Sequence, residues 1–162
     1  MPDAFMDVTP VTQTLEQSGI PYRFFRHAGQ VHSVEQAAQE RGLNVDQVVR
    51  SIVFRTGPAN FVMVLVTGTR QISWPRLRKY LNLSRLTMAT EEEVLRTTGY
   101  KLGAVSPFGL PAPMPVLVDQ SVMAFDEVSI GSGERNSAIF LKTFDLLKAL
   151  GQVEVVNFSE SG

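Results

Sequence analysis

Two apolar segments near the middle of the chain, 49–55 and 61–66, constrain the fold most strongly. They flank a turn-rich linker at 56–60, Thr-Gly-Pro-Ala-Asn, so the pair predicts a β-hairpin. The second segment, Phe-Val-Met-Val-Leu-Val, is apolar throughout, which is typical of a central strand covered on both faces. A hairpin of this kind needs other elements packed on each side of its sheet.

The rest of the chain mixes helix and strand signals irregularly. Capping residues precede the expected helices, with Thr9, Ser33, Ser73, Thr90 and Thr143 as N-caps. Helices are expected at about 10–18, 33–42, 73–81, 90–99 and 144–150, and short strands at 22–26, 114–118, 127–130, 138–141 and 153–156. This order predicts an α/β mixed fold, with helices packed around a mixed sheet rather than a regular βαβ winding. At 162 residues we expect a single domain, residues 1–162.

Glycine and proline alternate in the segment 99–115. Three glycines (Gly99, Gly103, Gly109) permit positive φ or close backbone approach, while four prolines fix φ and remove N–H donors. The segment therefore predicts a loop of defined shape. It forms either one wall of a pocket or an ordinary long connection, and composition alone does not separate the two.

Composition excludes several classes of function. The chain has no cysteine, so disulfides, thiolate metal sites and cysteine nucleophiles are excluded, and only two histidines are present. We expect neither a metal nor a cofactor. No apolar run reaches the roughly 20 residues that span a bilayer, and the first residues are acidic where a signal peptide is basic. We therefore expect a cytoplasmic protein without a membrane partner.

Basic residues are concentrated although the net charge is only −1. The segment 47–90 contains no Asp or Glu but seven cations: Arg50, Arg55, Arg70, Arg76, Arg78, Lys79 and Arg85. This asymmetry fits a face that meets phosphates. It fits equally a solvated surface whose acids come from other segments.

Arg50 is unusual because the two-residue period of its strand places it on the same face as Ile52 and Phe54. An unpaired arginine on an apolar face is costly to bury. We expect it to lie at a cavity mouth, facing an anion or carbonyl, or to pair with a carboxylate.

Familiar catalytic motifs are missing. The second glycine-rich loop, Gly-Ser-Gly-Glu-Arg-Asn at 131–136, is not a phosphate-binding Gly-x-Gly-x-x-Gly and by itself predicts a hairpin turn. The chain has no Gly-x-Ser-x-Gly elbow, and only His27 and His32 are available as histidine bases.

The order of the motifs resembles the YbaK/ProX family of free-standing aminoacyl-tRNA editing domains, which are related to the editing insertion of bacterial prolyl-tRNA synthetases. The resemblance covers about residues 10–157. Its blocks are Ser-Val-Glu-Gln-Ala-Ala at 33–38, 42–54, Thr-Gly-Thr-Arg-Gln-Ile at 67–72, 98–109, Pro-Val-Leu-Val-Asp at 115–119, and 131–135. The most specific block is Gly-Tyr-x-x-Gly-x-x-Ser-Pro-x-Gly, starting at Gly99.

The resemblance implies a mixed α/β fold with a curved sheet, and a cleft that holds the 3′ end of a mischarged tRNA. The family hydrolyses the ester that joins the amino acid to the terminal ribose. An aminoacyl-tRNA synthetase is a further candidate partner. In such chemistry the protein contributes positioning and donors to the developing oxyanion. The implied site residues are catalytic Arg50, Gly103 and Ser106, substrate-binding His32, Phe54, Pro107, Gly131, Ser132 and Gly133, and phosphate-binding Arg70, Arg76, Arg78 and Lys79.

One position departs from the family pattern. Members carry lysine where this chain has Arg50, and arginine is larger, planar and does not readily deprotonate. Two hypotheses therefore remain: a trans-acting deacylase of mischarged tRNA, and a non-catalytic module that binds aminoacyl-tRNA or a nucleotide-like ligand on the same fold.

Overall fold

The computed structural model describes residues 7–161 and contains five α-helices within that range. They are α2 (Pro10–Gln17), α3 (Val34–Arg41), α4 (Trp74–Leu81), α5 (Glu91–Thr98) and α6 (Thr143–Leu150), with the 3-10 helices η1 (Val45–Gln47) and η2 (Gln120–Ala124). The strands are β1 (Arg23–Arg26), β2 (Val49–Gly57), β3 (Asn60–Thr67), β4 (Gln71–Ile72), β5 (Thr87–Met88), β6 (Val116–Asp119), β7 (Glu127–Gly131), β8 (Ser137–Lys142), β9 (Glu154–Val156) and β10 (Ser159–Glu160).

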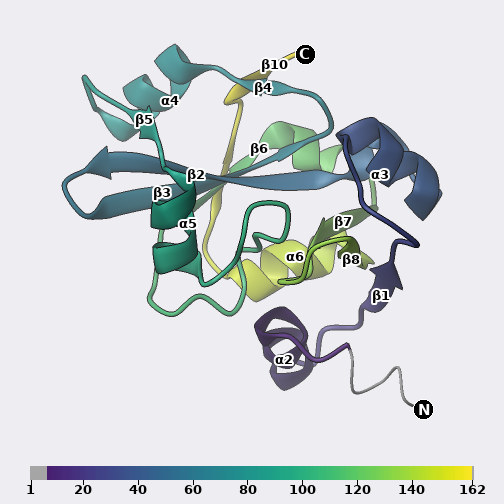
Figure 1. The fold of residues 1–162 in the computed structure, drawn as a ribbon. Coiled ribbons are helices and arrows are strands. Elements are labelled where there is room, and N and C mark those ends of the chain that lie inside the picture. Colours follow the sequence, from purple (N-terminus) through teal and green to yellow (C-terminus); the bar gives the residue numbers. More distant parts are fainter. Residues whose placement is uncertain (1–6, 162) are drawn as a thin grey trace.

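The strands form three sheets. The largest has the order β5-β2-β3-β6-β9, in which β3, β6 and β9 run parallel and the other pairs are antiparallel. An antiparallel sheet, β1-β8-β7, meets it through a bridge between Val48 and Ser129. Strands β4 and β10 form a separate pair. The predicted α/β mixed architecture is confirmed, with the strands distributed over three sheets (Figure 1).

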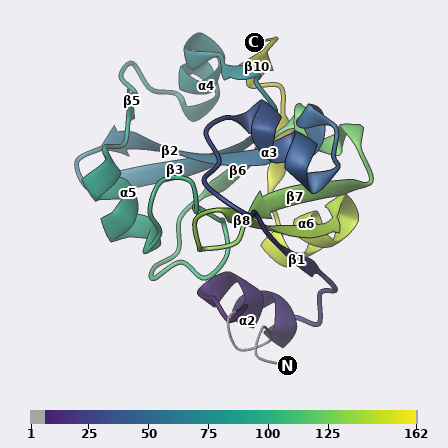
Figure 2. The same cartoon turned by 45° about the vertical axis from the view of Figure 1, so that its right-hand side comes forward.

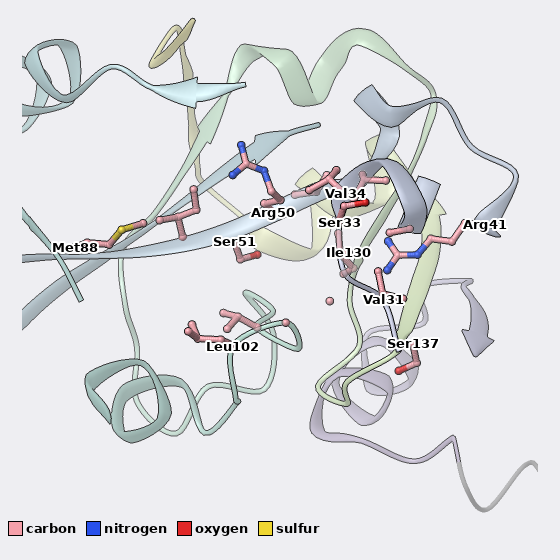
Figure 3. A pocket seen from close by; sticks show the side chains of 17 residues that line it. Val31, Ser33, Val34, Arg41, Arg50, Ser51, Met88, Leu102, Ile130 and Ser137 are labelled. Carbon is pink, nitrogen blue, oxygen red and sulfur yellow. The ribbon is translucent and has the colours of Figure 1, made fainter. Parts of the chain in front are cut away.

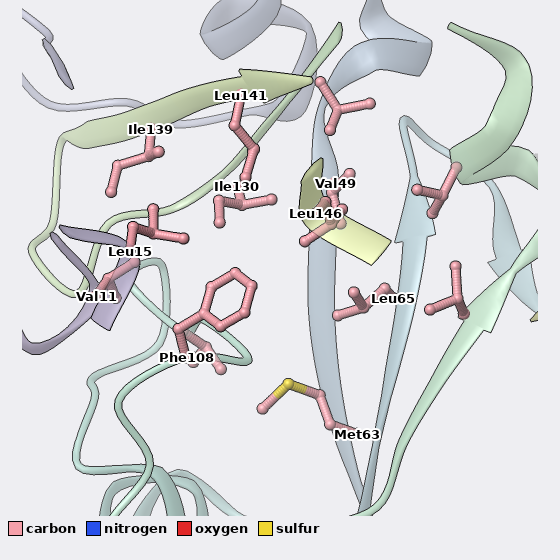
Figure 4. Close-up of a cluster of buried hydrophobic side chains, with 14 of the residues drawn as sticks. Val11, Leu15, Val49, Met63, Leu65, Phe108, Ile130, Ile139, Leu141 and Leu146 are labelled. Atoms are coloured by element: carbon pink, nitrogen blue, oxygen red, sulfur yellow. The ribbon is translucent and has the colours of Figure 1, made fainter. Parts of the chain in front are cut away.

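The β2–β3 hairpin separates two buried clusters. Cross-strand partners share a face, so Val49, Val53, Met63 and Leu65 face one cluster. Figure 4 shows this cluster closed by residues of α2, β7, β8 and α6 and by Phe108. Residues on the other face of the hairpin join a smaller cluster that also contains Leu77 and Phe158. The expectation that segment 61–66 is covered on both faces is confirmed.

The smaller cluster lies at the end of the molecule that carries α4 and β10, whereas α2 lies at the opposite end (Figures 1 and 2). Because β10 pairs with β4, the C-terminal segment closes over the α4 end. Asp119 holds this closure: its carboxylate accepts the Phe158 N–H at 2.7 Å and the Ser159 hydroxyl at 2.7 Å.

Most predicted helix starts are found. The hydroxyls of Thr9, Ser33, Ser73 and Thr90 each accept an N–H of the first turn. The prediction that Thr143 caps the last helix is wrong. Lys142 occupies the N-cap, and the Thr143 hydroxyl donates to the Phe125 carbonyl at 2.6 Å instead.

None of the helices in the described range is long and apolar enough to cross a membrane. The acidic first residues, which argued against a signal peptide, lie for the most part outside the described residues.

Candidate functional site

A cleft with two lobes opens where α3, β2 and the loop 99–115 come together, and Figure 3 shows the larger lobe. We call its larger part, of about 440 Å³, the apolar lobe. It is lined mainly by aliphatic side chains, together with a few polar residues: Val31, Ser33, Val34, Ala37, Arg41, Val48, Val49, Arg50, Ser51, Ile52, Met88, Leu102, Gly103, Val105, Ile130, Gly131 and Ser137.

A second cavity, of about 320 Å³, adjoins the first, and we call it the polar lobe. It is lined by Gln30, Val31, Arg41, Leu102, Gly103, Arg135, Asn136 and Ser137. The two lobes share five of these residues, Val31, Arg41, Leu102, Gly103 and Ser137, so they form one continuous cleft. Gly103 and Arg41 stand where the lobes meet.

Gly103 lies in a tight turn of the loop 99–115. The Ala104 N–H donates to the Lys101 carbonyl at 3.0 Å, and Gly103 has a φ of 89°. This is the third position of a type II turn, which requires positive φ and so favours glycine. Within the described part of the chain the Gly103 N–H has no hydrogen-bond acceptor. It is therefore a free donor at the junction of the two lobes.

The loop is fixed against β7 by close backbone contact. A Cβ at Gly131 would lie 2.0 Å from the Val105 carbonyl oxygen, so only glycine fits there. Next to it, the Gly133 N–H donates to the Ala104 carbonyl at 3.0 Å. The Gly133 N–H is therefore not available to a ligand. The two glycine-rich loops together form one wall of the cleft.

Ser51 supplies a second free polar group, which sequence reasoning missed. Figure 3 shows its hydroxyl pointing from β2 toward the side of Leu102. The Ser51 Oγ is buried and has no hydrogen-bond partner in the described structure. Alternation along the strand gives the only sequence signal, because Ser51 shares its face with Val49 and Val53.

Arg50 lines the apolar lobe, but its guanidinium lies on the other side of β2 from Leu102 (Figure 3). There it donates from Nη2 to the Arg70 carbonyl, while its Nε is buried without a partner. It forms no ion pair with a carboxylate among residues 7–161. Of the interpretations left open by the sequence, the contact with a carbonyl is the one found. Burial lowers the pKa of Arg50.

Arg41 is a charged residue that points into the cleft, and the sequence-based reasoning missed it as well. Figure 3 shows its guanidinium reaching from α3 toward Val31 and Ile130. A signal was available: Val34, Ala37 and Arg41 follow a helical i, i+3, i+7 spacing, and all three line the apolar lobe.

Three predicted site residues lie outside the cleft: Phe54 and Ser132, predicted to bind substrate, and Ser106, predicted to be catalytic. Phe54 is 1% exposed and contacts Trp74 edge-on within the smaller cluster, because its face of β2 turns away from the cleft. Ser106 is fully buried, and its hydroxyl accepts the Phe108 N–H at 3.2 Å. Ser132 is also fully buried and bonds Ser137 at 2.6 Å. The structure thus places these three in supporting positions.

Two further predicted residues lie beside the cleft without lining it. Pro107 is buried within the loop. His32 is exposed, and its neighbours Val31 and Ser33 line the apolar lobe in its place. Of the predicted set, Arg50, Gly103 and Gly131 come together at the cleft.

The basic residues predicted to meet phosphates gather around α4. Arg70 donates to the Ser159 hydroxyl at 2.7 Å, and Arg76 donates to the Ser159 carbonyl at 3.1 Å. Both therefore brace β10. Arg78 and Lys79 form no ion pair in the described structure, and Lys79 is exposed. No group of three or more acidic or histidine residues able to hold a metal occurs among residues 7–161.

Comparison with known proteins identifies the family. The model of the family described as the aminoacyl-tRNA editing domain matches residues 28–149. The chain is 27% identical to the multifunctional Ser/Thr-tRNA deacylase ProXp-y of Escherichia coli K12, over 89% of this chain and 87% of that protein. It is 32% identical to the protein YwhH of Bacillus subtilis, over 70% and 72% of the two chains.

A proline–tRNA ligase of Thermosipho melanesiensis is 30% identical over 68% of this chain, which spans only 19% of the ligase. Among solved structures, a candidate trans-editing enzyme for prolyl tRNA synthetase superimposes with a TM-score of 0.83 at 26% identity, covering 95% of this chain and 99% of that one. The family model spans every residue that lines the two lobes of the cleft. The chain belongs to the aminoacyl-tRNA editing domain family.

Proposed function

We propose that this chain is a trans-acting deacylase that hydrolyses the ester bond of mischarged aminoacyl-tRNA. The observation that carries the proposal is the pair of unpartnered polar groups, the Gly103 N–H and the Ser51 hydroxyl, in the cleft of an editing-family chain. Its similarity over most of its length to a Ser/Thr-tRNA deacylase supports the same conclusion.

In the proposed reaction, water attacks the carbonyl carbon of the ester. The negative charge that develops on the carbonyl oxygen is stabilised by the Gly103 N–H, a fixed donor that needs no reorganisation. The bond from carbon to ribose oxygen then breaks. The water proton is transferred to that oxygen through the neighbouring ribose hydroxyl, which leaves a free amino acid and tRNA.

Ser51 is assigned to positioning the acyl group. Its hydroxyl lies at the β2 side of the apolar lobe, whose aliphatic walls suit a small side chain. A bound amino group or side-chain hydroxyl would satisfy the buried Ser51 Oγ. A one-methylene difference between substrates is worth only about 1–3 kcal/mol in such a pocket, so we expect a group of small amino acids as substrates.

The test is release of the amino acid from tRNA esterified with serine, threonine, alanine or cysteine, at enzyme concentrations near that of the substrate. We expect release from at least one ester, reduced about 3- to 10-fold in Ser51→Ala, which corresponds to one neutral hydrogen bond. Ser84→Ala, at an exposed position, is the matched control and keeps full activity. No release from any ester above the uncatalysed rate would refute the deacylase.

The placement of Arg50 favours a second candidate, a non-catalytic binding module. Its guanidinium lies on the far side of β2 from Leu102 and donates to the Arg70 carbonyl, so it points away from the side of the cleft on which Leu102 lies. Under this alternative, the wild-type chain binds aminoacyl-tRNA without hydrolysis, and Arg50→Lys creates or strongly raises hydrolysis. If Arg50→Ala abolishes an existing activity while binding persists, the enzyme is retained as the function.

A further inference from the structure

The polar lobe of the cleft has an excess of positive charge. Two arginines, Arg41 and Arg135, line it, and its other lining residues include no acid. Neither arginine forms an ion pair with a carboxylate in the described structure. A concave site with two unneutralised guanidinium groups attracts an anion.

Arg41 is held in place by neutral partners. Its Nε donates to His27 Nε2 at 3.1 Å and its Nη1 donates to the Ser129 hydroxyl at 3.0 Å. Its Nη2 makes no hydrogen bond to the described residues. Burial lowers the pKa of Arg41 to about 10, so the group is still cationic at neutral pH. Glu40 is near enough to stabilise this charge but does not pair with it directly, so an anionic ligand would stabilise the half-buried cation further.

The nearest acid, Glu40, is turned away from Arg41 by other partners. One oxygen accepts from Gln36 at 2.8 Å, and the other lies 2.6 Å from His27 Nδ1. Because His27 Nε2 accepts from Arg41, the Nδ1 proton of His27 faces Glu40. The chain Glu40–His27–Arg41 therefore orients the guanidinium, and no carboxylate contacts it directly.

Arg135 reaches the same lobe from the second glycine-rich loop. Its Nε donates to the Leu102 carbonyl at 3.1 Å, which anchors the side chain to the turn that holds Gly103. Its two Nη groups have no partner within residues 7–161. Two guanidinium forks, one from α3 and one from this loop, thus border the lobe beside the free Gly103 amide.

We propose that the polar lobe is an anion subsite, bordered by Arg41 and Arg135, for the phosphodiester on the 5′ side of the terminal adenosine of tRNA. The identity of the anion rests on the proposed function, whereas the subsite itself does not. With the ester carbonyl at Gly103, the aliphatic walls of the apolar lobe take the acyl group. The polar lobe on the other side of Gly103 is then left for the ribose and its phosphate.

The test measures binding rather than turnover. The probe is the dinucleotide cytidylyl-(3′→5′)-adenosine, compared by calorimetry with the same dinucleotide carrying an uncharged methylphosphonate linkage. We expect the wild-type chain to bind the charged probe more tightly. Arg41→Gln and Arg135→Gln should each weaken its binding about 10- to 100-fold, which corresponds to one charge-assisted hydrogen bond, and should leave the weak binding of the neutral probe unchanged.

The matched control is Arg23→Gln, which removes an exposed arginine on β1 outside the cleft. It should bind both probes as the wild-type chain does, so a general charge effect is separated from the subsite. Arg135 is exposed and makes one hydrogen bond within residues 7–161, so Arg135→Gln keeps the test valid if Arg41→Gln fails to fold. Arg41→Lys should recover only part of the affinity, because lysine lacks the planar fork.

Equal binding of the charged and neutral probes by the wild-type chain would overturn the subsite. So would a preference for the charged probe that both Arg41→Gln and Arg135→Gln leave unchanged. The experiments distinguish failure of the subsite from failure of the proposed function. Charge-dependent binding without release of any amino acid would support the subsite and refute the deacylase. Release of an amino acid that neither arginine variant reduces would support the deacylase and refute the subsite.

Discussion

Gly131 marks the place where two loops distant in the sequence approach most closely. A Cβ there would lie 2.0 Å from the Val105 carbonyl oxygen and 3.1 Å from that of Ala104, and backbone atoms cannot rotate away. Gly131→Ala should therefore lower the free energy of unfolding by at least about 1–3 kcal/mol. Urea denaturation measures the change. Gly29→Ala, where a Cβ meets nothing within 4 Å, is the control and should stay close to wild type.

A second single residue, Glu40, should make the stability of the fold depend on pH. The hydrogen bonds from Gln36 and His27 hold the pKa of Glu40 below its ordinary value. In the window between the folded and ordinary carboxyl pKa values, the folded state binds fewer protons than the unfolded state. The stabilisation is therefore complete above the ordinary pKa and is lost as the pH falls through the folded one.

Glu40→Gln should remove this contribution, so the variant should lose less stability on acidification than the wild-type chain. Urea denaturation at neutral pH and at a pH below the ordinary carboxyl value measures the difference. Parallel curves for the two proteins would show that the Glu40 bonds do not contribute.

At the scale of elements, Asp119 joins the end of β6 to the C-terminal strand. It is fully buried and accepts hydrogen bonds from the Phe158 amide, the Ser159 hydroxyl and the Ser121 amide. Bonds to a charged acceptor are worth about 1.5–3 kcal/mol. Asp119→Asn removes the charge and one acceptor. It should release β10 from β4 and raise the amide exchange rate of Phe158 well above that of buried amides in β3.

The same variant tests how far β10 matters to the basic face. Because Arg70 and Arg76 both donate to Ser159, release of β10 should also disorder these two side chains. Unchanged exchange at Phe158 in Asp119→Asn would mean that the β4–β10 pairing holds β10 without this carboxylate.

At the scale of the whole molecule, the charge on α4 should govern how binding of intact tRNA depends on salt. Each phosphate contact contributes about 0.7–0.9 to the slope of log K against log salt concentration. Neutralising Arg78 and Lys79 together, with glutamine at both positions, should reduce that slope by up to about 2 while leaving dinucleotide binding unchanged. A matched pair, Lys142→Gln at the N-cap of α6 with Lys148→Gln within α6, is the control. An equal loss of slope in both double variants would assign the effect to net charge alone.

Local sequence determined the elements of this protein. Thr90 accepts the Glu93 amide while the Glu93 side chain accepts the Thr90 amide, a reciprocal cap written within four residues. Side chains likewise alternate between the two faces of β2, and this two-residue period correctly groups Arg50 with Ile52 and Phe54. Such features depend on neighbours in the chain, so the sequence alone predicts them.

Only the tertiary structure decided which side chains reach the cleft. The two-residue period of β2 places Arg50 and Ser51 on opposite faces of the strand. It does not say which face meets the loop 99–115, because that depends on packing between segments far apart in the chain. The cleft lies on the Ser51 side, so Phe54 is core and Ser51 lines the lobe. Arg41 enters the site for the same reason: α3 packs so that its Val34–Ala37–Arg41 face turns toward β2, and His27 and Ser129, distant in sequence, fix the guanidinium there.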